Sequence, residues 1–135
     1  MRVKATREGL IGDVTASGWR IDAERSFVAL PSHKALHRFV LVTNPLTGLS
    51  TRAEVLDVGP WCEHDDAYVF EGARPLSESG WHVDTTGKLV QGITNGAGID
   101  LGEAVWRALA MTDNGDVEWT MEPLVAEPIV ALRVA

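Results

Sequence analysis

The sequence predicts a mainly β fold with one short α-helix and a long loop insertion. Short apolar runs rich in β-branched residues recur along the chain, with turn-forming residues between them. Only one segment, about residues 101–110, repeats its apolar side chains at helical spacing. The 135 residues are 45% hydrophobic and 23% charged, which is the length and composition of one globular unit. We therefore expect residues 1–135 to form a single domain.

The first predicted strands are the apolar runs at 27–30 and 39–43. Turn residues separate the second run from a third at 51–58, which indicates a hairpin. Apolar and polar residues alternate along this third run, so Asp57 is expected at its end on an otherwise apolar face. The Gly59-Pro60 pair then stops the strand.

Residues 62–92 are polar and irregular, which predicts a long loop insertion that rims a site. A short ordered hairpin around 81–90 is the alternative for part of it. The helix at 101–110 follows, and Asp100 with Glu103 three residues later has the form of a capping box at its start. Two further strands are expected at 117–121 and 128–134.

Charge and hydropathy exclude several classes of function. The formal charge is −7 and the basic residues are scattered, so nucleic acid is not an expected partner. The longest apolar runs are far shorter than a membrane span, and the charged N-terminal residues do not form a signal peptide. Cys62 is the only cysteine, so no internal disulfide forms. We expect a monomer without membrane insertion.

Four motifs come in an order that resembles a known family. They are Thr15-Ala16-Ser17-Gly18, the strand end Val42-Thr43-Asn44, the segment Asp57-Val58-Gly59-Pro60 and the helix start Ile99-Asp100-Leu101. This order resembles the double-psi β-barrel of rare lipoprotein A and of the expansin N-terminal domain. The match runs from about residue 6 to residue 121. The resemblance implies a six-stranded barrel built from two interlocked halves.

The same resemblance implies a groove that binds glycan chains. In the family, the aspartate at the I-D-L position is the general acid and base of peptidoglycan lytic transglycosylases, and it corresponds to Asp100 here. Asp57 is its expected catalytic neighbour. From the residues alone, an N-cap is the better account of Asp100, and bonding to turn amides is the better account of Asp57. The resemblance brings the catalytic interpretation of Asp100 level with the cap, and both interpretations stay open. A peptidoglycan enzyme must be delivered to the cell envelope or outside it, so the location is open: without such delivery the chain is cytoplasmic or phage-associated.

Two departures bring the sequence closer to expansins. The histidine that precedes the V-T-N strand in rare lipoprotein A aligns with Pro31, and the arginine of the family's D-R-G-P motif is replaced by Val58. Expansins share the fold without established hydrolysis. The alternatives to a lytic transglycosylase are therefore a non-catalytic domain that binds peptidoglycan or another β-linked polysaccharide, and a barrel reused for protein interaction.

The expected substrate contacts combine aromatic faces with small polar side chains. Indole and phenol rings can stack on sugar rings. Trp106 and Trp119, in contrast, are expected in the core. The candidate contacts are Thr6, Ser17, Trp61, Tyr68, Trp81 and Asn95.

The insertion also contains residue types that bind metals. Cys62, Glu63, His64, Asp65 and Asp66 are followed by His82 and Asp84, but their spacing matches no zinc motif. A solvated acidic loop accounts for them better. No cofactor and no metal is therefore expected.

Overall fold

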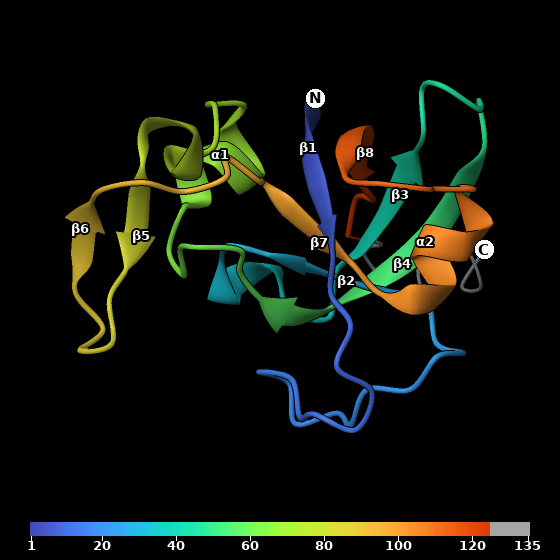
Figure 1. The fold of residues 1–135 in the computed structure, drawn as a ribbon, viewed down its shortest axis with the longest axis horizontal. Helices are drawn as coiled ribbons and strands as arrows, with labels where there is room; N and C mark the ends of the chain where they lie inside the picture. The colour runs from blue at the N-terminus through green and yellow to red at the C-terminus, as the bar shows by residue number, and fades with distance from the viewer. Residues whose placement is uncertain (125–135) are drawn as a thin grey trace, which may run out of the picture.

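The computed structural model describes residues 1–124, and six strands in this part of the chain form a closed barrel (Figure 1). Their order around the barrel is β1-β7-β2-β4-β3-β8. This arrangement confirms the mainly β fold and the six-stranded barrel. The strands are β1 (Arg2–Arg7), β2 (Phe27–Leu30), β3 (Phe39–Thr43), β4 (Ser50–Val58), β7 (Ile99–Leu101) and β8 (Gly115–Met121).

Two parallel pairs give the barrel its topology. Strand β1 runs parallel to β7, and β2 runs parallel to β4. The two pairs meet where β2 and β7 lie antiparallel, and β3 and β8 close the remaining circuit with antiparallel neighbours. Residues far apart in sequence are therefore hydrogen-bonded neighbours at the junction of β1, β7, β2 and β4.

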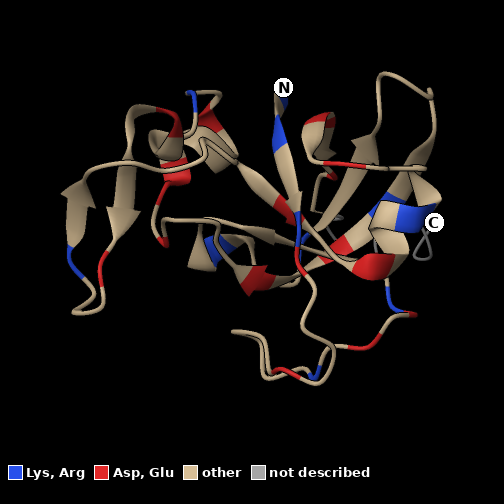
Figure 2. Cartoon of the chain, in the orientation of Figure 1, with Lys and Arg blue, Asp and Glu red and all other residues tan. Residues whose placement is uncertain are grey.

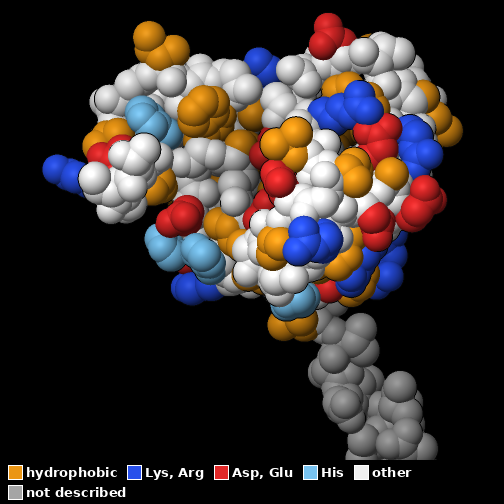
Figure 3. All heavy atoms as spheres, turned by 60° about the horizontal axis from the view of Figure 1, so that its bottom comes forward, with side chains coloured by type: hydrophobic (Ala, Val, Ile, Leu, Met, Phe, Trp, Pro, Cys, Tyr) orange, Lys and Arg blue, Asp and Glu red, His pale blue; other side chains and the backbone are white. Residues whose placement is uncertain are grey.

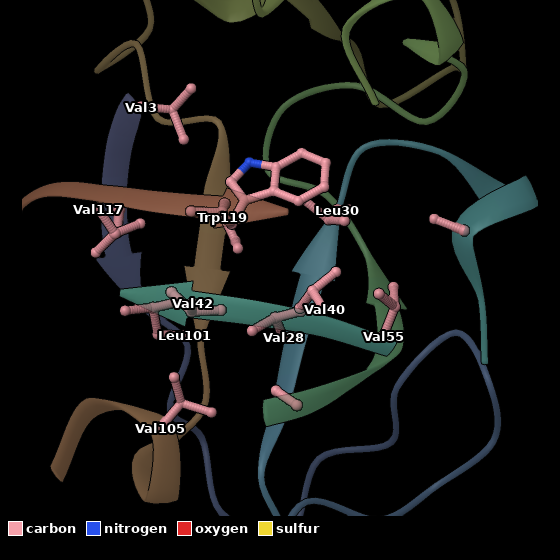
Figure 4. Close-up of a cluster of buried hydrophobic side chains, with 14 of the residues drawn as sticks. Val3, Val28, Leu30, Val40, Val42, Val55, Leu101, Val105, Val117 and Trp119 are labelled. Atoms are coloured by element: carbon pink, nitrogen blue, oxygen red, sulfur yellow. The ribbon is translucent and has the colours of Figure 1, made fainter. Parts of the chain in front are cut away.

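The barrel interior is filled by side chains that alternate along the strands, and Figure 4 shows several of them together with Val105, which comes from the helix at Glu103–Ala108. Trp119 and Trp106 are both buried, as the sequence predicted. Tyr68 closes one end of the core, where its ring meets Trp119 edge to face at 5.8 Å between centroids. Its hydroxyl donates to the Gly98 carbonyl at 2.9 Å and accepts from Trp119 Nε1 at 2.8 Å. The buried phenol is thus fully hydrogen-bonded.

A second, smaller cluster lies outside the barrel, between the barrel strands and the long connection from β1 to β2. Ile21, Phe27 and Leu56 are buried there, with Trp19 packed against them. The T-A-S-G turn is part of this connection. It is attached to β4, because Ser17 N donates to the Leu56 carbonyl at 3.2 Å. The connection is visible in Figure 1 as the blue loop beneath the barrel.

A β-bulge changes the direction of the β4 side chains. Val28 pairs with Val55, but the next residue, Ala29, pairs with Asp57, so β4 has one extra residue here. A bulge breaks the alternation of side chains. Val55 belongs to the barrel core, whereas Leu56 packs in the outer cluster and Asp57 lines a pocket outside the barrel. The predicted common face for Asp57 and its apolar neighbours is therefore wrong.

The segment predicted as a long loop contains regular structure. It forms α1 (Asp66–Glu71), the 3-10 helix η2 (Leu76–Ser79) and a hairpin of β5 (Trp81–Val83) and β6 (Leu89–Gln91). The hairpin was the alternative that the sequence left open. In Figure 1 the hairpin and α1 form an arm beside the barrel. Another 3-10 helix, η1 (His33–Ala35), connects β2 to β3.

The predicted helix at 101–110 is shorter than expected, and its expected cap is wrong. Helix α2 spans Glu103–Ala108, and its N-cap is Gly102, without a side-chain cap bond. Asp100 lies in β7 instead. Glu103 accepts a hydrogen bond from Arg7 Nε at 2.8 Å, so its carboxylate is not part of a capping box.

A glycine is required at the start of α2. A Cβ at Gly102 would lie 2.4 Å from Phe27 Cε1 and 3.0 Å from the Phe27 carbonyl oxygen. The helix can therefore approach β2 only through a residue without a side chain. Among the helices of residues 1–124, none has the length and hydropathy needed to cross a bilayer. The strand predicted at 128–134 lies outside the described residues.

Candidate functional site

A pocket of about 470 Å³ lies outside the barrel, where the ends of β1, β4 and β7 meet the connection between β1 and β2. Figure 2 shows acidic residues on β4, on β7 and directly after β1 near this junction. Figure 3 shows the same face with acidic side chains recessed in a hollow between hydrophobic ones. The carboxyl groups belong to Glu8, Asp57 and Asp100.

Strand pairing places two of these carboxyl groups in one row. Thr6 pairs with Asp100, and Ala29 pairs with Asp100 on one side and with Asp57 on the other. Residues paired directly across strands point to the same face of the sheet. Thr6, Asp100 and Asp57 therefore line one pocket, and the buried Ala29 lies between the two aspartates.

Asp100 is held in a protonatable state near neutral pH. Burial raises the pKa of Asp100 to about 6, the hydrogen bond from Thr6 Oγ1 opposes this rise, and the nearby Asp57 carboxyl adds to it. A carboxyl group with such a pKa can donate a proton and accept one within a narrow pH range. Asp100 is thus chemically suited to acid and base roles.

Asp57 is fixed by backbone amides. Its Oδ1 atom accepts from Ala16 N at 2.8 Å and from Val58 N at 3.0 Å. The first of these amides belongs to the T-A-S-G turn, which explains why that motif and the D-V-G-P motif occur together. The expected bonding of Asp57 to turn amides is therefore present, and it coexists with a position in the pocket wall.

Glu8 is a pocket residue that the sequence did not reveal. Its amide donates to the Leu101 carbonyl at 2.8 Å, so the residue leaves β1 beside β7. Burial, then the neighbouring Asp57 and Asp100 carboxyl groups, together raise the pKa of Glu8 to about 9. Its Oε2 atom is buried without a hydrogen-bond partner among the described residues. A protonated Glu8 can donate to a ligand oxygen.

Trp61 forms the aromatic side of the pocket and is 38% exposed. Its Nε1 donates to Asn95 Oδ1 at 2.7 Å, and the same oxygen accepts from Ala97 N at 3.0 Å. The backbone of Trp61 has a φ of 67°, which is rare for a bulky residue. Val83 N of the hairpin donates to the Trp61 carbonyl at 2.7 Å, which supports this conformation.

Exposed aliphatic side chains lie on the pocket wall formed by the connection between β1 and β2. Leu10 is 72% exposed and Val14 is 57% exposed, and both line the pocket. The pocket therefore combines carboxyl groups with apolar faces from Trp61, Leu10 and Val14. This combination suits a ligand that has both hydroxyl groups and apolar faces, as sugar rings do.

The structure brings five predicted site residues together and separates three from them. Thr6, Asp57, Trp61, Asn95 and Asp100 line the pocket. The other three predicted residues do not line it, and Tyr68, which is 1% exposed, lies in the core rather than on a rim. Ser17 Oγ bonds Thr15 Oγ1 at 2.8 Å, and the Trp81 carbonyl accepts from Cys62 Sγ at 3.4 Å.

The pocket does not contain the one potential metal cluster found in residues 1–124. That cluster consists of His33, Glu63 and His64, whose donor atoms all lie within 4.8 Å of one another. The buried Cys62, whose pKa burial raises to about 11, is not part of it.

Comparison with solved structures agrees with the barrel fold. A mutant Clavibacter michiganensis expansin, solved in complex with cellohexaose, matches with a TM-score of 0.50 and 20% identity. The match covers 95% of this chain and 54% of that one, so the chain spans about half the length of the expansin. This likeness confirms the expansin-type barrel that the motif order implied.

Two shorter proteins also match over most of both chains. The Streptomyces papain inhibitor has a TM-score of 0.47 and 17% identity, with 89% of this chain and 93% of that one covered. Cerato-platanin 3 from M. perniciosa has a TM-score of 0.49 and 10% identity, with coverages of 91% and 95%.

At the level of sequence, no curated protein matches the chain. One family model, described as a domain of unknown function (DUF8814), matches residues 1–120, which is most of the chain and includes every residue of the pocket. The chain therefore belongs to the DUF8814 family and has an expansin-like β-barrel.

Proposed function

We propose that the pocket binds a β-linked polysaccharide such as peptidoglycan or cellulose. The exposed indole of Trp61 beside three carboxyl groups is the observation that carries this proposal. An indole face stacks on the apolar face of a sugar ring, and carboxyl groups bond its hydroxyl groups. The mutant expansin with a similar barrel was solved with cellohexaose, an oligosaccharide of this class.

The backbone around Trp61 supports the same proposal. A bulky residue in the left-handed region is a costly conformation that persists where surrounding contacts hold it, often at a binding site. Here the hairpin amide of Val83 and the Asn95 side chain both bind Trp61. The hairpin of the insertion therefore holds the Trp61 backbone, Asn95 holds its indole at the edge of the pocket, and their role is to present this surface to the glycan.

Cosedimentation with insoluble glycans tests the binding function. Purified protein is mixed with cellulose, chitin and peptidoglycan sacculi, and Trp61→Ala is compared with Phe70→Ala. Phe70 is the matched control because it is an exposed aromatic residue, 40% accessible, that does not line the pocket. We expect Trp61→Ala to lower retention about tenfold or more, whereas Phe70→Ala binds like the wild type. Equal retention of both variants would contradict the proposal.

Cleavage of the bound glycan is a second candidate function, and the raised pKa of Asp100 favours it. Asp100 in its acid form would protonate the glycosidic oxygen as the bond from C1 to that oxygen breaks. The resulting carboxylate would then take the proton of the sugar's C6 hydroxyl while O6 bonds to C1. The products are a shortened glycan and a 1,6-anhydro end, and Asp100 regains its proton, as in a lytic transglycosylase.

Product analysis separates cleavage from binding. Wild-type protein and Asp100→Asn are incubated with sacculi, and the soluble fragments are analysed by mass spectrometry. Anhydro-ended fragments from the wild type alone would establish cleavage and the role of Asp100. No fragments from either protein, together with retention on the sacculi, would leave a non-catalytic binding domain.

A further inference from the structure

The side chains of His33, Glu63 and His64 converge on the surface. One donor atom from each residue lies within 4.8 Å of those of the other two, and all three residues are exposed. The two imidazole rings lie 5.0 Å apart between centroids, at an angle of 31°. Figure 3 shows two adjoining histidine side chains beside an acidic one on this face of the molecule. Three potential ligands are thus gathered at one place on the surface.

Backbone hydrogen bonds hold these residues in place. Ser32 and His64 form an antiparallel bridge between the segment before η1 and the segment after Trp61. His33 N donates to the Glu63 carbonyl at 3.1 Å, and Asp65 N donates to the Pro31 carbonyl at 2.8 Å. These bonds hold the two backbone segments side by side before an ion binds, which favours binding.

A further carboxylate lies beside the cluster. Asp66 accepts from Ser32 Oγ at 2.5 Å and pairs with Lys34 Nζ at 3.1 Å. These contacts hold Asp66 two residues from His64, so a second carboxylate adjoins the three potential ligands. Because Asp66 contacts Ser32 and Lys34, it is not counted as a ligand.

The donor set determines which ion fits. Two imidazoles and one carboxylate are ligands of zinc and of neighbouring transition metals, whereas magnesium and calcium prefer oxygen alone. The nearby thiol of Cys62 is buried and is directed to the Trp81 carbonyl, so no thiolate joins the set. We propose that His33, Glu63 and His64 form a surface site for one divalent ion of the zinc class.

Three protein ligands leave one position of a tetrahedral zinc ion for water or for another molecule.

The sequence pointed to Glu63 and His64 but not to this site, because His33 is about thirty positions away and only the bridge between the two segments brings it close. The proposed site and the carboxyl pocket share no residue.

Calorimetric titration of the full chain with zinc chloride, after removal of metals with a chelator, tests the proposal. We expect one equivalent to bind to the wild type, and the double variant His33→Ala/His64→Ala to lose this binding. Glu63→Gln should weaken it about tenfold or more, because one ligand becomes neutral. His37→Ala is the matched control, since His37 is also exposed but pairs with Glu54 at 3.1 Å.

Imidazole NMR signals provide a readout that does not depend on the affinity. Zinc should shift the ring signals of His33 and His64 and leave those of His37 and His82 unchanged. The proposal is overturned if the double variant binds zinc as tightly as the wild type, or if His37→Ala weakens binding to the same extent as the double variant. Thermal unfolding without metal verifies that each variant is folded, which the exposed positions favour.

Discussion

Replacing Asp100 by asparagine should stabilise the protein at alkaline pH and have little effect in acid. Asp100 has a pKa of about 6 in the folded chain, against an ordinary value of 3.8, chiefly because it is buried. Between these two values the folded state binds more protons than the unfolded state. The free energy of unfolding therefore falls as the pH rises from about 4 to about 6, and it does not recover above that.

The size of the effect follows from the pKa. A rise of about two pKa units corresponds to about 3 kcal/mol at 1.36 kcal/mol per unit, which is an upper bound for a group that retains some contact with water. We expect Asp100→Asn to gain about 1–3 kcal/mol at pH 8 relative to the wild type. The amide oxygen can still accept from Thr6 Oγ1, so this contact is retained.

Urea unfolding monitored by tryptophan fluorescence at several pH values between about 4 and 8 measures this difference. The curves of Asp100→Asn and wild type should nearly coincide at the acid end and separate through about pH 6. The wild type continues to lose stability toward about pH 9 because the pKa of Glu8 is also raised, but Asp100→Asn shares most of that loss. Asp113→Asn, at an exposed site outside the pocket, is the control. A constant difference at all pH values would refute the reasoning.

Three further predictions test other contacts. Asp57→Asn should lower the pKa values of both Asp100 and Glu8, because it removes a neighbouring charge that raises them. Carbon-13 NMR titration of the carboxyl groups measures both pKa values, and unchanged values would contradict the prediction. Tyr68→Phe should lower the free energy of unfolding by about 1–3 kcal/mol, since it leaves the buried Gly98 carbonyl and Trp119 Nε1 without this partner. Urea unfolding measures the loss, and an unchanged free energy of unfolding would contradict the prediction. Gly102→Ala should cost about 1–3 kcal/mol in the same assay because its methyl group would collide with Phe27. Ala104→Gly, at a half-buried position of the same helix, should cost only about 1 kcal/mol.

Four of the six barrel strands, β2, β3, β4 and β8, were predictable because their apolar runs are short, β-branched and separated by turns, whereas β1 and β7 were missed. The runs at 27–30 and 39–43 coincide with β2 and β3. The third strand illustrates the limit of this reasoning. Alternation along 51–58 predicted one face for Val55 and Asp57, but the bulge opposite Ala29 turns Asp57 out of the barrel. A bulge depends on the pairing with another strand, which the local pattern does not contain.

The candidate site was predictable in part. The motif order led to Asp57, Trp61 and Asp100, and Thr6 and Asn95 were expected as polar substrate contacts. All five line the pocket, although their roles stay predictions. Glu8 was missed because it approaches the aspartates only through the parallel pairing of β1 with β7, across more than ninety residues. No local pattern marks such a residue.

The expected cap at Asp100 failed for a related reason. Aspartate followed by glutamate three residues later has the form of a cap, but Asp100 pairs with strands on both sides and Glu103 binds Arg7. Tertiary pairing thus overrides the local signal.

Most of the insertion was predicted as a loop because its helices and strands are only three to six residues long. Such short elements do not produce a recognisable hydrophobic period in the sequence.

The row from Asp100 through Ala29 to Asp57 has a consequence for how this pocket can change. Both aspartates pair with the same alanine, so their backbones are two strand spacings apart, about 10 Å. Hydrogen bonds of the barrel set that separation, and the loops do not. Substitutions in the β1–β2 connection or in the hairpin can alter which molecule fits above the row, while the two carboxyl groups keep their spacing. The same barrel can therefore accept different ligands while the positions of Asp57 and Asp100 stay unchanged.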